Sequence, residues 1–404
     1  MIMKFVLPMF AFLSRAERRE RRRDTERHRA ASAGFSGRGK ARARILMGVS
    51  VCLLGAAASP SVFAQGSVTL YGIIDSGLTY TSNQSGKGNL FFQGGTMVPT
   101  VWGLRGVEDL GDGTQAIFKL VDNFNSGTGA MTNGLLFGKE SWVGLQDDKL
   151  GALTLGNQFD FMFKYMTIDR WGAELRISPV YFTQQGPFAK LGLPNGAMDF
   201  DRTAGSITTN NSVAYESTNY GGFRFGAMYA IGGQAGSTSQ DSTQSYGMRY
   251  TNGTVTLDAA YTYTKFPGIN DGNNGIRNWG VGGRVAVFNG GYIDAMFTNT
   301  ENTYTGGQVN VYEVGGYYPL TSVDKVVLDY QFDQGNAVLE KNKANQVGLT
   351  LAHDLSRNTF IYATLVRQWA GGDSANVQAI IIGSGGTSSG STQTLGRVGM
   401  TLRF

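Results

Sequence analysis

The chain has 404 residues, of which 58 are glycine, only 8 are proline and 12% are aromatic. This composition excludes a disordered chain, and the 16% of charged residues is lower than an ordinary soluble surface uses. After residue 64 no uninterrupted apolar run reaches the length of a membrane helix. A membrane location would therefore require a closed sheet, the other structure that satisfies every backbone polar group in lipid.

The N-terminal region predicts an export signal. The apolar stretch Ile45–Ala58 follows basic residues and precedes a small-residue cleavage pattern that ends at Ala64. We therefore assign residues 45–64 to a signal peptide and residues 65–404 to the exported domain. Residues 1–44 form a basic extension. It is either an arm for nucleic acid or membrane surfaces, or the product of a start codon placed upstream of the true one near Met47; we favour the second reading.

The basic character of the chain belongs to this leader. Residues 1–64 carry 13 of the 35 Lys and Arg and 4 of the 30 Asp and Glu, so the remainder carries 22 and 26, a formal charge of −4. The only cysteine, Cys52, also lies in the leader. The exported domain is therefore expected to bind no nucleic acid and to be stable without disulfides.

From Gln65 onward, short alternating segments are separated by turns. In the last segment Val398, Met400, Leu402 and Phe404 share one face, which in a transmembrane barrel would face lipid. Seven connections are short: Glu108–Gly113, Asp147–Gly151, Thr218–Gly222, Asn252–Gly253, Asn289–Gly291, Pro319–Asp324 and Asp354–Asn358. Eight are long: Thr81–Gly95, Asn125–Gly134, Gln158–Asp201, Gly233–Ser242, Phe266–Asn274, Asn302–Gln308, Gln334–Asn342 and Ala370–Thr392. This alternation predicts an all-β fold, a sixteen-stranded antiparallel transmembrane β-barrel with both termini on the short-turn side.

The longest connection, Gln158–Asp201, has no steady alternation, carries charges of both signs and contains three prolines. A connection of this length inside a compact domain is usually functional. We expect it to fold into the barrel lumen and to narrow it. Its aromatic residues leave open a specific channel for sugars or aromatic acids, although we favour packing of these side chains against the wall. They are Phe159, Phe161, Phe163, Tyr165, Trp171, Tyr181 and Phe182.

Seven motifs are spread along the exported domain: GSVTLYGIID at Gly66–Asp75, VWGLRGVEDLGDGTQAIF at Val101–Phe118, SWVGL at Ser141–Leu145, GALTLGNQFD at Gly151–Asp160, NNSVAY at Asn210–Tyr215, DLSRNTFIY at Asp354–Tyr362 and the terminal RVGMTLRF. They resemble the trimeric general porins of Gram-negative bacteria, in particular their β-proteobacterial branch. The resemblance covers the exported domain in order. It implies a homotrimer of sixteen-stranded barrels, each with its third external loop folded inward as an eyelet.

In such porins, loop carboxylates face basic residues on the opposite wall, and the resulting field sorts polar solutes. The resemblance suggests Asp160, Asp169 and Glu174 as the constriction-loop carboxylates, and Lys139 and Arg202 as basic wall residues. Alternation adds Arg105 and Lys119 as weaker lumen candidates. Three positions that are often arginine in the family are Val101, Asn157 and Asn210 here, so we expect a weaker positive wall. Phe404 matches the terminal aromatic read by the barrel-insertion machinery, although Leu402 replaces the usual histidine.

The sequence shows no arrangement of residues that would indicate catalysis. His353 is the only histidine after residue 64 and has no companion motif for a Ser-His hydrolase. We find no cysteine–histidine metal pattern and no phosphate loop. We therefore expect no enzyme, no cofactor and no metal; Asp271 and Asp373 in outer loops are assigned to solvated loops rather than to calcium.

These observations predict a general diffusion porin of the cell outer membrane that passes ions and small hydrophilic solutes. Its expected partners are two further copies of the chain, outer-membrane lipid and the insertion machinery. The alternatives are an outer-membrane hydrolase on a smaller barrel, an adhesin or structural barrel without a channel, and a substrate-specific channel.

Overall fold

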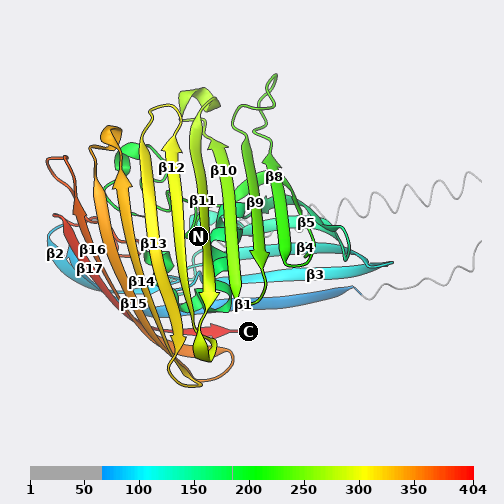
Figure 1. Ribbon diagram of the computed structural model, residues 1–404, viewed down its shortest axis with the longest axis horizontal. Helices are drawn as coiled ribbons and strands as arrows, with labels where there is room; N and C mark the ends of the chain where they lie inside the picture. The colour runs from blue at the N-terminus through cyan, green and yellow to red at the C-terminus, as the bar shows by residue number, and fades with distance from the viewer. Residues whose placement is uncertain (1–65, 184) are drawn as a thin grey trace, which may run out of the picture. The chain divides into compact units, whose positions relative to one another are not determined.

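The computed structural model describes residues 66–183 and 185–404. The predicted extension (residues 1–44), the signal segment (residues 45–64) and Gln65 lie outside the described residues. The described residues belong to one compact unit, Ala64–Phe404. They form antiparallel strands around a ring (Figure 1). The strands are β1 (Ser67–Gln84), β2 (Lys87–Gly94), β3 (Val101–Gly111), β4 (Thr114–Asn123), β5 (Glu140–Asp147), β6 (Gly151–Gln158), β7 (Thr209–Glu216), β8 (Phe223–Ala230), β9 (Thr243–Thr251), β10 (Val255–Lys265), β11 (Gly275–Ala286), β12 (Tyr292–Asn302), β13 (Gln308–Pro319), β14 (Asp324–Gly335), β15 (Lys343–Asp354), β16 (Thr359–Gly371) and β17 (Thr392–Arg403).

The barrel closes between the first and last strands. One edge of β1 pairs with β17, from Ile73 opposite Arg403 to Thr81 opposite Leu395. The other edge of β1 pairs first with β3 and then with β2, so β2 and β3 share one position in the ring. The 17 strands therefore fill sixteen positions, because one position is shared. The predicted sixteen-stranded antiparallel barrel is confirmed.

The seven short connections lie where the sequence predicts them, but the predicted loop Thr81–Gly95 is wrong. Strand β1 continues to Gln84, and β2 begins at Lys87 after a tight turn at Ser85 and Gly86, with φ values of 52° and 92°. Asn83 Oδ1 accepts a hydrogen bond of 2.8 Å from the Gly86 backbone N–H. The polar composition of this region suggested a loop, but ladder hydrogen bonds join backbone groups and do not require apolar side chains.

Each strand presents two different faces. In β16 Phe360 and Tyr362 are buried, whereas Ile361 and Leu365 are 43% and 53% exposed. The same contrast recurs around the ring, where apolar residues such as Leu257, Val314 and Val398 are about half exposed on the outer face. An apolar outer face and a polar inner face suit a barrel in lipid around an aqueous interior.

Residues 159–208, between β6 and β7, form the longest connection and are called the long connection below. It extends seven residues beyond the predicted end at Asp201 and contains most of the short helices. The helical turns of the described residues are η1 (Thr132–Gly134), α2 (Phe161–Phe163), η2 (Lys164–Asp169), η3 (Gly172–Ile177), η4 (Pro179–Phe182), η5 (Ala189–Leu191), η6 (Asn270–Gly272), η7 (Phe288–Gly290) and η8 (Ala337–Leu339). None of the helices in the described part of the chain is long and apolar enough to cross a membrane.

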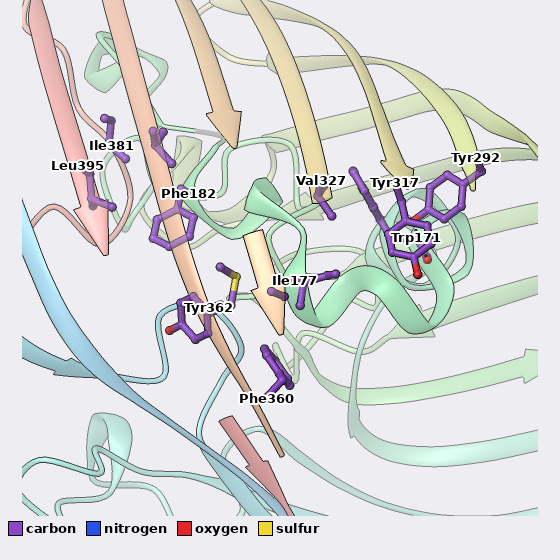
Figure 2. Close-up of a cluster of buried hydrophobic side chains, with 13 residues drawn as sticks. Trp171, Ile177, Phe182, Tyr292, Tyr317, Val327, Phe360, Tyr362, Ile381 and Leu395 are labelled. Atoms are coloured by element: carbon purple, nitrogen blue, oxygen red, sulfur yellow. Dashed lines mark hydrogen bonds between the residues drawn. The ribbon is translucent and has the colours of Figure 1, made fainter. Parts of the chain in front are cut away.

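Apolar side chains of the long connection pack against the inner face of the wall. One cluster brings Trp171, Ile177 and Phe182 of the connection toward aromatic residues of β12, β13 and β16 (Figure 2). A second cluster joins Phe161 and Tyr165 to Met228 and other residues of β7, β8, β10 and β12. Most of the predicted aromatic side chains are thus buried between connection and wall, which favours the packing role over a track for solutes.

Candidate functional site

The two ends of the long connection are clamped together by Asp160 and Arg202. Asp160 Oδ1 accepts hydrogen bonds from the backbone N–H groups of Met162 (2.9 Å) and Phe163 (3.3 Å), which caps α2. Asp160 Oδ2 forms an ion pair with Arg202, and both side chains are buried. Arg202 also donates to Thr209 Oγ1 at 3.3 Å. These two predicted site residues therefore pair with each other beneath the surface.

Lys139, just before β5, contacts the same part of the connection. Asp160, Arg202 and Lys139 together are called the clamp below. Its Nζ donates to the Gly205 carbonyl at 2.5 Å and lies 5.0 Å from the centre of the Phe159 ring. Burial lowers the pKa of the Lys139 ammonium to about 8, because the charged form loses its hydration. Lys139 therefore holds the connection to the wall.

The middle of the long connection is fixed by Arg170, which has no exposed surface. Its guanidinium forms ion pairs with Asp294 of β12 and with Glu313 of β13, the latter at 2.5 Å, and Nε donates to the Met166 carbonyl at 2.7 Å. The Trp171 carbonyl next to it accepts a hydrogen bond of 3.1 Å from the Tyr292 hydroxyl. A fully buried arginine with two carboxylates holds the connection in one position.

The two remaining loop carboxylates differ in their partners. Asp169 is paired with Arg249 of β9 at 2.9 Å and lies 3.8 Å from Arg224 of β8. Glu174, in η3, is half-buried and forms no ion pair within the described residues. Nearby Arg176 pairs instead with Asp354 of β15 at 3.8 Å. Glu174 is thus the predicted loop carboxylate whose charge is left uncompensated.

On the wall strands, Arg105 and Lys119 are register partners on the inner face. Arg105 is exposed, stacks over Tyr71 at 5.5 Å and forms no ion pair within the described residues. Lys119 is partly exposed and is neutralised by Glu140 of β5, with 2.5 Å between Nζ and Oε2. Of the four predicted basic residues, Arg105 alone combines exposure with an uncompensated charge.

Comparison with known proteins identifies the family of the chain. The model for Gram-negative porins matches residues 50–370. The chain belongs to the Gram-negative porin family. A relative of this porin, an outer membrane porin protein of Bordetella pertussis, is 29% identical to it over 74% of this chain and 88% of that protein.

Two solved outer-membrane protein structures share the fold. The anion-selective porin from Comamonas acidovorans has a TM-score of 0.70 and 24% identity, and the match covers 84% of this chain and 100% of that one. OmpT of Vibrio cholerae in its trimer form has a TM-score of 0.57 and 13% identity, covering 84% and 99% of the two chains. The protein is thus an outer-membrane porin that crosses its membrane with many strands.

The C-terminus of the porin lies against the first strand. Phe404 and Gly72 exchange two backbone hydrogen bonds of 3.1 Å each, and the Phe404 ring is half exposed on the outer side. A Cβ on Gly72 would come within 2.3 Å of that ring and within 2.8 Å of the Val101 carbonyl oxygen, and because the backbone oxygen cannot turn away, this close approach favours glycine. Leu402 is also exposed outward, so the change from histidine leaves the alternation of faces intact.

Sequence reasoning missed several inner-face residues of this porin. Glu140, Lys164 and Glu216 form ion pairs inside the barrel, and Arg397 pairs with Asp75 near the closure. Strand parity could have identified Glu140, because Glu140 and Trp142 alternate with the outward-facing Val143. No local signal identifies the partner of Lys164, since Glu216 lies 52 residues away.

Two buried carboxyl groups that form no ion pair among the described residues, Asp199 and Asp201, lie near the end of the long connection. Asp201 accepts hydrogen bonds from Thr203 and Thr298, each at 2.8 Å, and has no exposed surface. Burial, together with the charge of Asp199, raises the pKa of the Asp201 carboxyl to about 7. Burial also raises the pKa of the Asp199 carboxyl, which accepts hydrogen bonds from Ala204 and Ser206.

This raised pKa predicts that Asp201 makes the porin less stable as the pH rises. Between its unfolded pKa near 3.8 and its folded pKa near 7, the native state holds the proton more tightly than the unfolded state. The free energy of unfolding therefore falls across this window, by up to about 4 kcal/mol for this group. Replacing Asp201 with asparagine should flatten that part of the pH profile and stabilise the barrel above pH 7.

The measurement is the urea midpoint of refolded protein in detergent, taken at several pH values from about 4 to about 8. Asp148→Asn, at an exposed turn, is the matched control and should leave the slope unchanged. An Asp201→Asn protein with the wild-type slope would show that Asp201 does not titrate in this range.

Proposed function

We propose that this porin is a general diffusion channel, with the long connection acting as its constriction. Ions and small hydrophilic solutes pass passively through the aqueous interior. The observation that supports the proposal is that the long connection covers only part of the inner wall. The long connection packs against β8–β16, whereas the inner face around Arg105 stays exposed. The open path then runs between the connection and the wall of β3–β6.

The charges that sort solutes on this path are Glu174 on the connection and Arg105 on the wall. Asp160, Arg202 and Lys139 serve as the clamp that holds the connection, and Asp169 and Lys119 are neutralised by ion pairs. One similar porin is anion-selective. We propose weaker selectivity here, because only one of the predicted wall cations and one of the predicted loop carboxylates lack an ion pair among the described residues.

This arrangement predicts opposite effects of two single substitutions. Arg105→Gln should shift permeability toward cations, and Glu174→Gln should shift it toward anions. Each change in the permeability ratio should be roughly two- to five-fold, since a unit charge a few ångströms from an ion contributes about 1 kcal/mol or less in water. The measurement is the zero-current potential of single channels in a planar bilayer under a salt gradient.

Lys149→Gln is the control, because Lys149 is exposed at a short turn and is no part of the proposed constriction. Shifts of the same sign for both variants, or shifts as small as that of the control, would reject Arg105 and Glu174 as the sorting charges. A folded, membrane-inserted protein without conductance would reject the channel itself and favour the adhesin or hydrolase alternatives.

We propose a homotrimer as the working assembly, as in the solved trimer form of OmpT. Outer-membrane lipid would contact the apolar outer face, and the insertion machinery would read Phe404. Catalysis is no part of the proposal. His353, the residue a hydrolase would need, pairs with Asp324 at 2.7 Å on the short-turn side. Conductance steps that appear in groups of three would support the trimer.

A further inference from the structure

A cavity of about 360 Å³ lies between the long connection and the wall strands β4–β7. The connection contributes Phe159, Lys164 and Ile168, and the wall contributes residues that include Ile117 and Trp142. A volume of this size falls within the range of small-molecule sites. Because the cavity opens beside the proposed solute path, the inference drawn from it rests on the proposed function.

Two ion pairs line this cavity. In one pair Lys119 Nζ lies 2.5 Å from Glu140 Oε2, and Trp142 Nε1 donates to the other oxygen of Glu140 at 3.1 Å. In the other pair Lys164 Nζ lies 3.4 Å from Glu216 Oε2. Each pair is partly exposed, so a solute can reach both.

Each lysine can leave its carboxylate to make room for a solute, because the carboxylate then keeps or gains another partner. If Lys164 turns to a solute carboxylate, Glu216 keeps its ion pair with Arg224 and its 3.2 Å hydrogen bond from the Tyr165 hydroxyl. If a solute ammonium approaches Glu140, the more exposed Lys119 can move into water while Trp142 holds the carboxylate. A zwitterion supplies both replacement partners, its carboxylate for Lys164 in place of Glu216 and its ammonium for Glu140 in place of Lys119, whereas an anion or a cation alone supplies only one.

The rest of the cavity lining is mixed. Polar side chains come from Gln146, Thr154 and Gln158. Ile168, which is 37% exposed, and Phe159 of the connection form an apolar part together with Ile117 of the wall. An apolar side chain of a solute would therefore leave water at this place.

We propose that this cavity is a binding site for small amphipathic zwitterions, such as amino acids with apolar side chains. Lys164 binds the carboxylate, Glu140 binds the ammonium, and Ile168 with Phe159 covers the apolar part. The site lies beside the open path, so it retains such solutes during passage and distinguishes this porin from a purely passive sieve.

The test uses three probes of equal ring size: L-phenylalanine, 3-phenylpropionate, which lacks the ammonium, and phenethylamine, which lacks the carboxylate. We expect phenylalanine to bind about ten-fold more tightly than either analogue. Affinity is measured by calorimetry on the refolded porin in detergent, and residence by current blockades of single channels. The calorimetric result stands whether or not the channel conducts.

Lys164→Met keeps the apolar stem and removes the charge, so it should weaken phenylalanine binding about five- to ten-fold. Ile168→Ser should reduce the advantage of phenylalanine over glycine. Lys87→Met, on the exposed start of β2, is the matched control and should change neither value.

Equal binding of phenylalanine and 3-phenylpropionate would overturn the proposal, as would phenylalanine binding that Lys164→Met leaves unchanged. Salt conductance without measurable phenylalanine binding would also overturn it and would leave the general channel function intact. Calorimetric binding by a protein that does not conduct would reject the proposed function instead.

Discussion

Replacing Arg397 with methionine is expected to lower the free energy of unfolding by about 3–5 kcal/mol, the cost of leaving one partner of a buried ion pair alone. Arg397 on β17 donates to Asp75 Oδ2 at 3.0 Å, to Thr79 Oγ1 at 2.9 Å and to the Tyr362 hydroxyl at 2.7 Å. Asp75 and Arg397 have no exposed side-chain surface. The network joins β1, β16 and β17, where the barrel closes.

The measurement is the urea unfolding midpoint together with the fraction of protein that refolds to the compact form on unheated gels. The Asp75→Asn/Arg397→Met double variant should recover part of the loss, because asparagine leaves no buried charge. Arg367→Met is the control, since Arg367 lies on β16 over Trp369 and pairs with no carboxylate among the described residues. Equal losses for Arg397→Met and the control would show that the closure network adds no stability.

Replacing Arg170 with methionine should release the long connection from the wall. Asp294 and Glu313 would then be buried without their shared cation, at a cost of about 3–5 kcal/mol. Because Arg170 is the buried ion-pair contact in the middle of the connection, we also expect noisier and larger single-channel currents. Thermal unfolding in detergent and bilayer recording measure the two effects.

The triple variant Arg170→Met/Asp294→Asn/Glu313→Gln separates the two effects, because it removes the arginine together with the two carboxylates that pair with it, although the buried Asp329 stays. It should recover much of the stability while the currents stay noisy. Arg176→Met is the control: its pair with Asp354 spans 3.8 Å and is partly exposed, so the loss should be below about 1 kcal/mol. Quiet, wild-type currents from Arg170→Met would show that Arg170 does not hold the connection.

The substitutions at Arg170 and at Arg105 address different properties. Arg170 is buried and fixes the position of the long connection, so its loss should change stability and current noise. Arg105 is exposed on the inner wall, so its loss should change ion preference at constant stability. Together the two substitutions distinguish the residues that hold the constriction in place from those that set its ion preference.

The sequence by itself determined the barrel. Strand alternation and turn residues are local signals, and the short connections lie where those signals predict them. The one misplaced connection, Thr81–Gly95, shows the limit of that signal. Beyond the apolar part of the wall, β1 and β2 keep pairing through backbone hydrogen bonds that side-chain polarity does not report.

The tertiary structure alone decided which charges face water. Asp160 and Arg202 are 42 residues apart, and Arg170 and Asp294 are 124 apart, yet each pair is buried in contact. An isolated carboxylate in the sequence gives no sign of such a partner, because pairing depends on how the long connection folds back on the wall. The same folding leaves Glu174 and Arg105 without an ion pair among the described residues, although other predicted site residues gain one.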